Sequence, residues 1–337
     1  MRLAVVGAGA IGAYVGAALA RGGSDVVLIA RGAHLEAMRR DGVTVLSPRG
    51  DFHADVEATD ELEAVGDADV VFLGLKAYSL TELAPRIAEH LRGDTPLIAA
   101  QNGIPWWYFQ SHPGALADLR LESVDPGGVI TDAFDPARVI GCVIYCSTEI
   151  VEPGVIRHIE GTRFAIGEPD GRKSERCLAI SERFKVGGLK CPVETNLREQ
   201  IWLKLIGNVA FNPVTALTGA TLGELGSVDD IVRVLRETMV ECAEVAGRLG
   251  IELPVSIDRR LEAGLAVGDH KTSMLQDLEA GKPLETACLT GAVLELGDRL
   301  GVATPHTRTI HACLELLQHV RATGEPAAAA QVSEPSR

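Results

Sequence analysis

The chain has 337 residues, of which 46% are hydrophobic and 4% aromatic, and its formal net charge is -14 at pH 7. This length allows two domains with separate cores, and the acidic charge argues against a nucleic acid or an anionic membrane as partner, because its field repels both. Seven cysteines without a C-x-x-C pair predict reduced core thiols of a cytoplasmic protein, with neither disulfides nor a metal site.

The first half of the chain alternates strand-like and helix-like segments. The β-branched run 2–7 begins too early in the chain to follow a signal peptide, and no apolar run reaches the length of a membrane span. Further strands are predicted at 25–31, 67–76 and 95–103, helices at 10–22 and 79–91, and a hairpin-like crossing at 42–58. Apolar strands separated by helices predict a parallel sheet that is covered on both faces.

The second half changes from strand to helix periodicity. Residues 139–167 contain strand-like pieces divided by EPG and EG turns, which predicts an antiparallel extension of the sheet. Helices are predicted from about 174 onward, with later ones at 228–249, 254–266, 274–280, 284–300 and 305–322. We therefore predict an α/β domain over 1–172, an all-helical domain over 173–323 and a disordered tail over 324–337.

A glycine-rich loop joins the first predicted strand to the first predicted helix. Its residues are Gly7, Ala8, Gly9, Ala10, Ile11 and Gly12, which have the G-x-G-x-x-G spacing. In this context the first glycine permits a tight turn, the second lets the backbone approach a pyrophosphate, and the third lets helix and strand pack closely. The free N–H groups of the helix N-terminus favour phosphate, so the loop predicts a dinucleotide site. A glycine-rich turn without a ligand is the alternative.

The end of the second strand distinguishes between nicotinamide cofactors. NAD sites usually carry an acidic residue there to hold the ribose 2′-OH, whereas this chain has Ala30 and Arg31 and no carboxylate before Glu36. An arginine at this place can bind a 2′-phosphate, and Lys76 could add a second positive charge. NADP(H) is therefore the predicted cofactor, with solvated loop cations as the alternative interpretation.

Three polar residues interrupt the apolar segment 201–213. Lys204, Asn208 and Asn212 recur every four residues and form one stripe on a helix, because they drift by only about 80° around its axis. Asn196, with Glu199 three residues later, is typical of a capped start for this helix. A half-buried lysine can protonate the alkoxide that hydride transfer creates, and desolvation is expected to lower its pKa toward the working range. Alternatively, Lys204 reaches solvent and the asparagines cap the helix before Pro213.

Two further polar segments are candidates for the site. Ser273 is predicted to cap the helix over 274–280, and Glu285 to lie in the first turn of the next helix, where the helix dipole favours its ionised form. Both features also have sufficient structural explanations. The QNG sequence at 101–103 is the stronger candidate because it follows a parallel strand, and ligands of open α/β sheets bind at the carboxyl ends of the strands.

These motifs together resemble the ketopantoate reductases (2-dehydropantoate 2-reductases) from Met1 to about residue 320. The pieces that carry the resemblance are GAGAIG, LKAY, QNG, IWLKLIGNVAFNPVTAL and TSMLQD, with a glutamate twelve residues after the serine. The resemblance implies an N-terminal Rossmann-type doubly wound sheet with an all-helical C-terminal domain, and an active site in the cleft between them. It also implies NADPH-dependent reduction of a small-molecule 2-keto acid, ketopantoate, to the pantoate used in pantothenate biosynthesis. A homodimer is left open.

The resemblance assigns roles to individual residues. It makes Lys204 the proton donor and Glu285 the active-site carboxylate, and it places Asn102 where nicotinamide and substrate meet. Asn208, Asn212 and Ser273 would bind the substrate, the serine through its carboxylate. The loop from Gly7 to Gly12, Arg31 and Lys76 would hold the cofactor.

The segment around Glu285 departs from the family pattern. The family usually has T-E-I-D followed by an asparagine-glycine pair, and this chain has LETACLTG, with Leu284, Thr286 and Ala287 around the glutamate and Thr290 in place of the asparagine. The alternative substrate is therefore a different 2-keto acid or another carbonyl compound. A second alternative is a dinucleotide-binding sensor without turnover, although such a protein would not need a buried lysine beside the nicotinamide.

Overall fold

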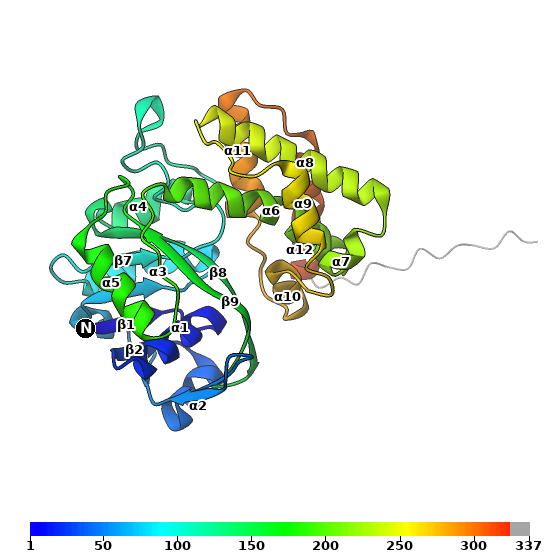
Figure 1. Cartoon of the computed structure of the whole chain (residues 1–337). Coiled ribbons are helices and arrows are strands. Elements are labelled where there is room, and N and C mark those ends of the chain that lie inside the picture. The colour runs from blue at the N-terminus through cyan, green and yellow to red at the C-terminus, as the bar shows by residue number, and fades with distance from the viewer. Residues whose placement is uncertain (324–337) are drawn as a thin grey trace, which may run out of the picture. The chain divides into compact units, whose positions relative to one another are not determined.

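The structure is a computed structural model that describes residues 1–323, so the predicted disordered tail lies outside the described residues. The chain divides into two compact units (Figure 1), one from Met1 to Leu205 and one from Ile206 onward. The division falls inside one continuous helix, α6 (Leu197–Thr218).

The first unit is built on a nine-stranded sheet with the order β4-β3-β9-β8-β7-β6-β1-β2-β5 (Figure 1). Its strands are β1 (Arg2–Val6), β2 (Asp25–Ile29), β3 (Val43–Leu46), β4 (Phe52–Ala54), β5 (Glu57–Thr59), β6 (Val70–Leu73), β7 (Leu97–Ala99), β8 (Val139–Glu152) and β9 (Val155–Gly167). Strands β5, β2, β1, β6, β7 and β8 run parallel to one another, whereas β9 returns antiparallel to β8 as predicted.

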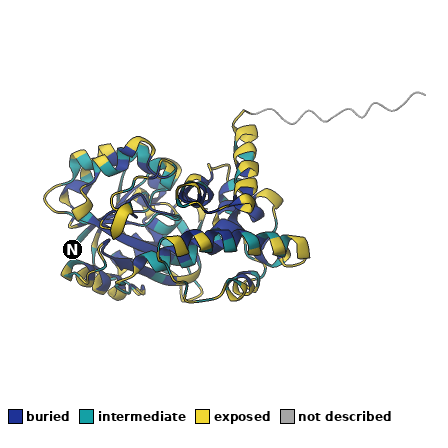
Figure 2. Cartoon of the chain, turned by 90° about the horizontal axis from the view of Figure 1, so that it is seen from above, coloured by how far each residue is buried: buried dark blue, intermediate teal, exposed yellow. Residues whose placement is uncertain are grey.

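Helices cover the sheet on both faces. The helices of this unit are α1 (Ala10–Arg21), α2 (Gly32–Asp41), α3 (Ala77–His90), α4 (Val129–Ala133) and α5 (Glu175–Val186). Neighbouring strand residues such as Leu3 and Ala4 are both fully buried, which is the pattern of a sheet covered on both sides. In Figure 2 much of the sheet is in the buried colour. The predicted Rossmann-type doubly wound sheet is therefore confirmed.

The unit boundary lies later in the chain than the predicted change at 172/173. Helix α5 follows that point, but its side chains Cys177, Ile180 and Phe184 belong to the same hydrophobic core as the sheet. The buried Glu168 at the end of β9 also accepts hydrogen bonds from Ser174 and Arg176 of this segment, the latter at 2.7 Å from Nε. Residues 173–205 therefore pack with the sheet, although their periodicity is helical.

One predicted turn is a strand irregularity instead. The EPG sequence makes the turn between β8 and β9, but Gly161 of the EG sequence lies inside β9, where the register with β8 shifts between Tyr145 and Ser147. Gly161 has φ +71°, and a Cβ there would lie 2.3 Å from the Tyr145 oxygen, so only glycine fits this bulge.

The second unit is all-helical, as predicted. It contains the remainder of α6, α7 (Leu222–Leu225), α8 (Asp229–Arg248), α9 (Ile257–Leu265), α10 (Ser273–Glu279), α11 (Ala292–Leu300) and α12 (Pro305–Thr323). Pro213 lies inside α6, which continues to Thr218. The alternative in which the asparagines cap a helix that ends at the proline is therefore wrong.

Two local predictions about helix starts in this unit are also wrong. The N-cap of α10 is Thr272, whose hydroxyl accepts from Leu275 N–H at 3.3 Å, and Ser273 is the first helical residue. The predicted helix 284–300 begins instead with a π-helical turn, Ala287–Gly291, which leads into α11. Glu285 therefore precedes the helix and does not lie in its first turn.

The cysteines and the helices bear on the expected class of protein. All seven cysteines are free thiols, but Cys313 is exposed on α12, so the prediction that all of them lie in the core is wrong for this one. None of the helices within residues 1–323 combines the length and the apolarity needed to cross a membrane.

Candidate functional site

The glycine loop follows β1 and leads into α1, whose N-cap is Gly9. Gly7 has φ +90°, and a Cβ there would lie 2.8 Å from the Leu75 nitrogen, while a Cβ on Gly12 would lie 2.3 Å from the Gly7 oxygen. These two glycines are therefore required by the protein's own packing. A Cβ on Gly9 would meet nothing within 4 Å, and its φ of -78° suits any residue. Open space over Gly9 is what a close-lying ligand requires.

The N-terminus of α1 is free to receive an anion. Within the described residues 1–323, no side chain caps the start of α1, and its first turn contains no acidic residue. Its first N–H groups and the positive end of the helix dipole therefore favour phosphate at the loop.

The loop lies where the strand order reverses. Strand β1 has β2 on one side and β6 on the other, and the chain reaches β6 only after β2 and β5 are complete. Arg31 is exposed and is the N-cap of α2 just beyond β2, and Lys76 is the half-buried N-cap of α3 just beyond β6. Both cations thus follow strands that neighbour the glycine loop, at the edge where open α/β sheets bind ligands.

A chain of contacts connects the glycine loop to Lys204 within the first unit. Gly7 packs against Leu75 of the loop after β6. Gln101, after β7, donates from Nε2 to the Leu73 and Leu75 carbonyls at 2.9 and 3.3 Å. The next residue, Asn102, accepts from Lys204 Nζ at 2.7 Å through Oδ1. The structure therefore brings the predicted Asn102 and Lys204 into direct contact, beside the predicted cofactor loop.

Lys204 is half-buried, and its positive charge acts on the pKa of two thiols of β8, Cys142 and Cys146. Burial raises the pKa of Cys142 and of Cys146 to about 12, with the lysine charge acting in the opposite direction on both. Both thiols therefore stay neutral near pH 7 and give Lys204 no thiolate partner. The short Nζ–Oδ1 distance is that of a charge-assisted hydrogen bond.

The second unit holds the remaining predicted residues. Asn212 is 7% exposed, and its carbonyl accepts from the Thr215 hydroxyl at 2.9 Å. Thr215 also shares a hydrogen bond of 2.6 Å with Thr272, the N-cap of α10. This pair fixes the start of α10 close to the polar stripe of α6. Ser273, the next residue, is exposed, and Asn208 is half-buried.

Glu285 is 8% exposed and lies just before the π-helical turn. Its neighbour Thr286 donates to Glu315 Oε1 of α12 at 2.7 Å, and Thr290 within the turn shares a hydrogen bond of 2.8 Å with His311 Nδ1. These contacts hold the segment around Glu285 against α12. Single π turns in proteins frequently occur at functional sites.

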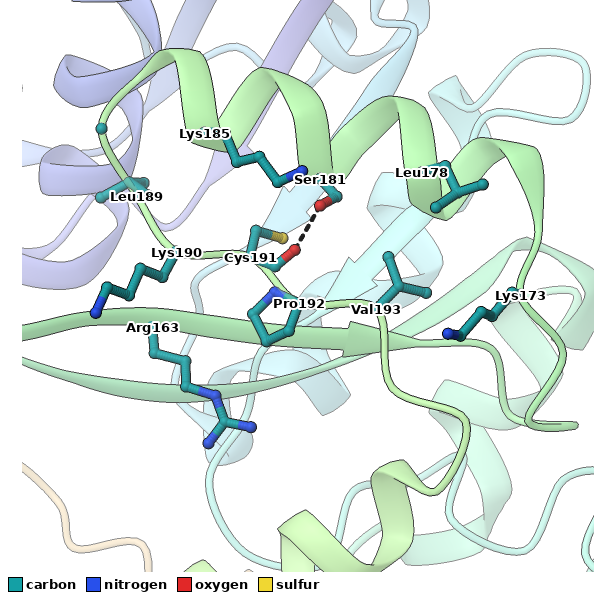
Figure 3. A pocket seen from close by; sticks show the side chains of 11 residues that line it. Arg163, Lys173, Leu178, Ser181, Lys185, Leu189, Lys190, Cys191, Pro192 and Val193 are labelled. Atoms are coloured by element: carbon teal, nitrogen blue, oxygen red, sulfur yellow. Dashed lines mark hydrogen bonds between the residues drawn. The ribbon is translucent and has the colours of Figure 1, made fainter.

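A groove elsewhere in the first unit is separate from this site. It has a volume of about 680 Å³ and lies between α5 and the segment 188–193 (Figure 3). Four cationic side chains rim it, and Leu178, Pro192 and Val193 contribute apolar surface (Figure 3); the cations are Arg163, Lys173, Lys185 and Lys190. None of the predicted site residues within 1–323 lines this groove, so it does not mark the candidate site.

Sequence reasoning assigned no role to three residues that organise the site. Gln101 ties the loop after β7 to the loop after β6, and its position in QNG was the available signal. Arg198 reaches three backbone carbonyls, two of them in the segment after Asn102, but an arginine near the start of a helix carries no such signal in sequence. Thr215 meets Thr272 across 57 residues of chain, which only the folded unit shows.

Comparisons with known proteins match nearly the whole chain to one family. A family model described as "Ketopantoate reductase PanE/ApbA" matches residues 3–171, and one described as "Ketopantoate reductase PanE/ApbA C terminal" matches residues 196–318. The chain is 44% identical over 321 residues to a Mesorhizobium japonicum protein named 2-dehydropantoate 2-reductase, with 95% of this chain and 98% of that protein covered.

Solved structures agree. The crystal structure of 2-dehydropantoate 2-reductase from Geobacter metallireducens GS-15 aligns with a TM-score of 0.82 at 29% identity, covering 94% of this chain and 100% of that one. The ternary structure of D-mandelate dehydrogenase with NADH and anilino(oxo)acetate aligns with a TM-score of 0.81 at 20% identity, covering 96% and 100%, which shows a shared fold alone. The chain therefore belongs to the ketopantoate reductase family, a family of NADP-dependent oxidoreductases.

Proposed function

We propose that this protein reduces the keto group of a 2-keto acid with NADPH, and that ketopantoate (2-dehydropantoate) is its substrate. The observation that carries the proposal is the hydrogen bond of 2.7 Å between Lys204 and Asn102. The residue before Asn102, Gln101, bonds to the loop after β6, and that loop packs against Gly7 of the loop after β1. The 44% identity to a protein named 2-dehydropantoate 2-reductase supports ketopantoate as the substrate.

The residues of the first unit fit a dinucleotide. Open space over Gly9 and the uncapped start of α1 suit a pyrophosphate. Arg31 stands beyond β2 where an NAD site has a carboxylate, and its guanidinium can bind a 2′-phosphate through two N–H groups. Lys76, at the start of α3, adds positive charge on the other side of the loop. NADPH supplies the hydride when it is bound at this place.

Lys204 is the proposed proton donor. Hydride addition to the keto carbon leaves an alkoxide, and the Lys204 ammonium transfers one proton to that oxygen and becomes a neutral amine, which solvent protonates again. Asn102 holds the ammonium through its side-chain oxygen and thereby fixes the direction of transfer. The positive charge also stabilises the developing alkoxide before the proton moves.

The proposed substrate contacts come from the second unit. Asn208 and Asn212 lie one and two turns along α6 from Lys204, and their amides can hold substrate oxygens. The exposed hydroxyl of Ser273 would bind the substrate carboxylate, and Glu285 would be the active-site carboxylate. The fixed start of α10 supports the role of Ser273, because the Thr215–Thr272 bond holds it near Asn212.

Reduction of a different 2-keto acid, or of another carbonyl compound, is the second candidate function. The segment around Glu285 carries Thr286 and Thr290, which hydrogen-bond to α12, and the same fold also serves a D-mandelate dehydrogenase. Fold alone does not select a substrate. A sensor without turnover is the third candidate. The cytoplasmic location and the homodimer stay predictions.

The test is a panel of 2-keto acids that includes ketopantoate, with the loss of NADPH absorbance as the readout. Highest kcat/KM for ketopantoate would support the proposal. A higher value for another keto acid would favour the second candidate, and no oxidation of NADPH with any compound, despite measurable NADPH binding, would favour the sensor.

A further inference from the structure

Arg198 makes a set of contacts that differs from those of the other arginines in the first unit. It lies on α6, six residues before Lys204, and its three hydrogen bonds all go to backbone carbonyls and none to a carboxylate. Nε donates to the Tyr108 carbonyl at 2.9 Å, and the two terminal nitrogens donate to the Pro169 and Gln110 carbonyls at 2.7 and 2.8 Å. Burial lowers the pKa of this guanidinium, but an arginine remains charged at any working pH. A charged, partly desolvated side chain is thus used to hold backbone.

Two more contacts reinforce the grip of α6 on this backbone. Trp202, one turn after Arg198, donates from its indole nitrogen to the Tyr108 hydroxyl at 2.7 Å. The Arg198 guanidinium also lies over the Tyr108 ring, with its central carbon 5.5 Å from the ring centroid. Both contacts end on the same tyrosine, so α6 and the segment around residue 108 are held as one piece.

Residues 106–110 form the segment that Arg198 holds, called the clamped segment below. Its own backbone hydrogen bonds are local, such as those from Tyr108 N–H to Pro105 and from Gln110 N–H to Trp107. The indole nitrogens of Trp106 and Trp107 and both amide atoms of Gln110 are buried without a hydrogen-bond partner in the described structure. Apolar packing of these side chains gives little directional restraint, because hydrophobic contacts are non-directional. The hydrogen bonds from Arg198 and Trp202 therefore tie this segment to α6 with defined directions.

The same two pieces of chain carry the reacting pair. Asn102 leads through Gly103 and Ile104 into the clamped segment, and Lys204 follows Arg198 and Trp202 on α6. The Asn102–Lys204 bond of 2.7 Å thus spans the two elements that Arg198 joins. A displacement of about 1 Å would break this bond, and misplacement of that size can cost about 100-fold in rate.

We propose that Arg198 is a positioning residue, which holds the segment after β7 against α6 so that Asn102 meets Lys204. Its catalytic consequence rests on the proposed reductase function. The hydrogen bonds of Arg198 go to Tyr108, Pro169 and Gln110 and not to Asn102 or Lys204, so its influence on the reaction passes through the backbone that it holds.

The principal test is a double-mutant cycle with Arg198→Ala and Asn102→Ala, measured with NADPH and the keto acid that the wild type reduces best. Arg198→Ala should lower kcat by about 10- to 100-fold, with the Kd of NADPH within about twofold because the phosphate loop is untouched. In the Asn102→Ala background the same change should cost less than about threefold, since residues that act through one another are not additive. Losses that multiply would overturn the proposal.

A second measurement does not depend on turnover. Hydrogen–deuterium exchange of the backbone between residues 102 and 110 should become faster in Arg198→Ala. Arg163→Ala is the matched control: Arg163 also contacts α6, through Gln200 at 3.2 Å, but its hydrogen bonds go to Gln200 and Glu194 and not to the clamped segment. Unchanged exchange in Arg198→Ala, or an equal increase in the control, would overturn the clamp. If the wild type reduced no keto acid, the proposed function would fail while this measurement still tested the clamp.

A milder variant covers the case in which Arg198→Ala does not fold. Arg198→Lys keeps the charge and the aliphatic stem, but one ammonium cannot reproduce the rigid fork that serves three carbonyls. It should give a smaller loss of kcat and the same lack of additivity with Asn102→Ala. Wild-type kcat in Arg198→Lys together with wild-type exchange would contradict the geometric role.

Discussion

Replacement of Lys204 by alanine is the most direct perturbation of the candidate site. The Lys204 ammonium donates to Asn102 at 2.7 Å and is the group proposed to protonate the alkoxide. Loss of a positioned general acid costs about 10²–10⁴ in kcat, which corresponds to about 2.7–5.5 kcal/mol of transition-state stabilisation. Asn102→Ala removes one charge-assisted hydrogen bond, worth about 1.5–3 kcal/mol, and should therefore cost less than loss of the lysine.

The structure also predicts that Lys204→Ala lowers kcat and leaves the affinity for NADPH unchanged. The proposed phosphate contacts lie on the glycine loop and on Arg31, outside α6, so the Kd of NADPH should stay within about twofold in Lys204→Ala. Lys204→Arg should not restore kcat, because a guanidinium keeps the charge but does not give up a proton at neutral pH.

Steady-state rates with the best keto acid, combined with a fluorescence titration of NADPH, separate these effects. A thermal melt of each variant should match the wild type, since a half-buried lysine on the surface of the site is not part of the core. Near-wild-type kcat in Lys204→Ala would refute the proposed mechanism and leave the polar stripe of α6 with a structural role alone. Full activity in Lys204→Arg would show that charge, and not proton transfer, is what the position supplies.

Three further predictions concern the cofactor and the stability of the fold. Arg31→Ala should weaken NADPH by about 1.5–3 kcal/mol and leave NADH unchanged, whereas Arg40→Ala on the same helix should affect neither; equal losses for both cofactors would remove Arg31 from the 2′-phosphate. Gly9→Ala should weaken NADPH binding in the same titration without changing the melting temperature, because its Cβ meets only open space in the protein. Gly12→Ala should instead destabilise the folded protein by about 1–3 kcal/mol, because its Cβ would lie 2.3 Å from a backbone oxygen. Burial would raise the pKa of Glu168, but hydrogen bonds from the arginine and serine beside it outweigh burial and hold this pKa below its usual 4.5. Its contribution to stability is thus complete above about pH 4.5 and is lost as the pH falls through the lowered pKa of the folded state. The difference in free energy of unfolding between wild type and Glu168→Gln should therefore shrink as denaturant titrations move from about pH 6 to about pH 3; a constant difference would contradict this.

Local sequence patterns were sufficient for much of the fold. The spacing of apolar residues and the positions of glycine-rich turns predicted the strands and helices of the first unit. Buried parallel strands and the glycine loop leave strong local signals of this kind. The same local logic predicted the stripe of Lys204, Asn208 and Asn212 on one helix, which α6 confirms. It failed where two local explanations competed, as at Thr272 and Ser273, either of which can cap a helix.

Contacts between distant segments decided the rest. The local sequence of 174–205 does not predict that α5 joins the core of the sheet. A helical spacing of apolar residues shows which face of a helix is buried, but not the surface against which that face packs. The bond between Asn102 and Lys204 joins residues 102 positions apart, and the Arg198 clamp spans 88 to 90 positions to residues 110 and 108. A sequence displays which side chains can donate and accept, but the distance between them is fixed only when the β-sheet and α6 pack together.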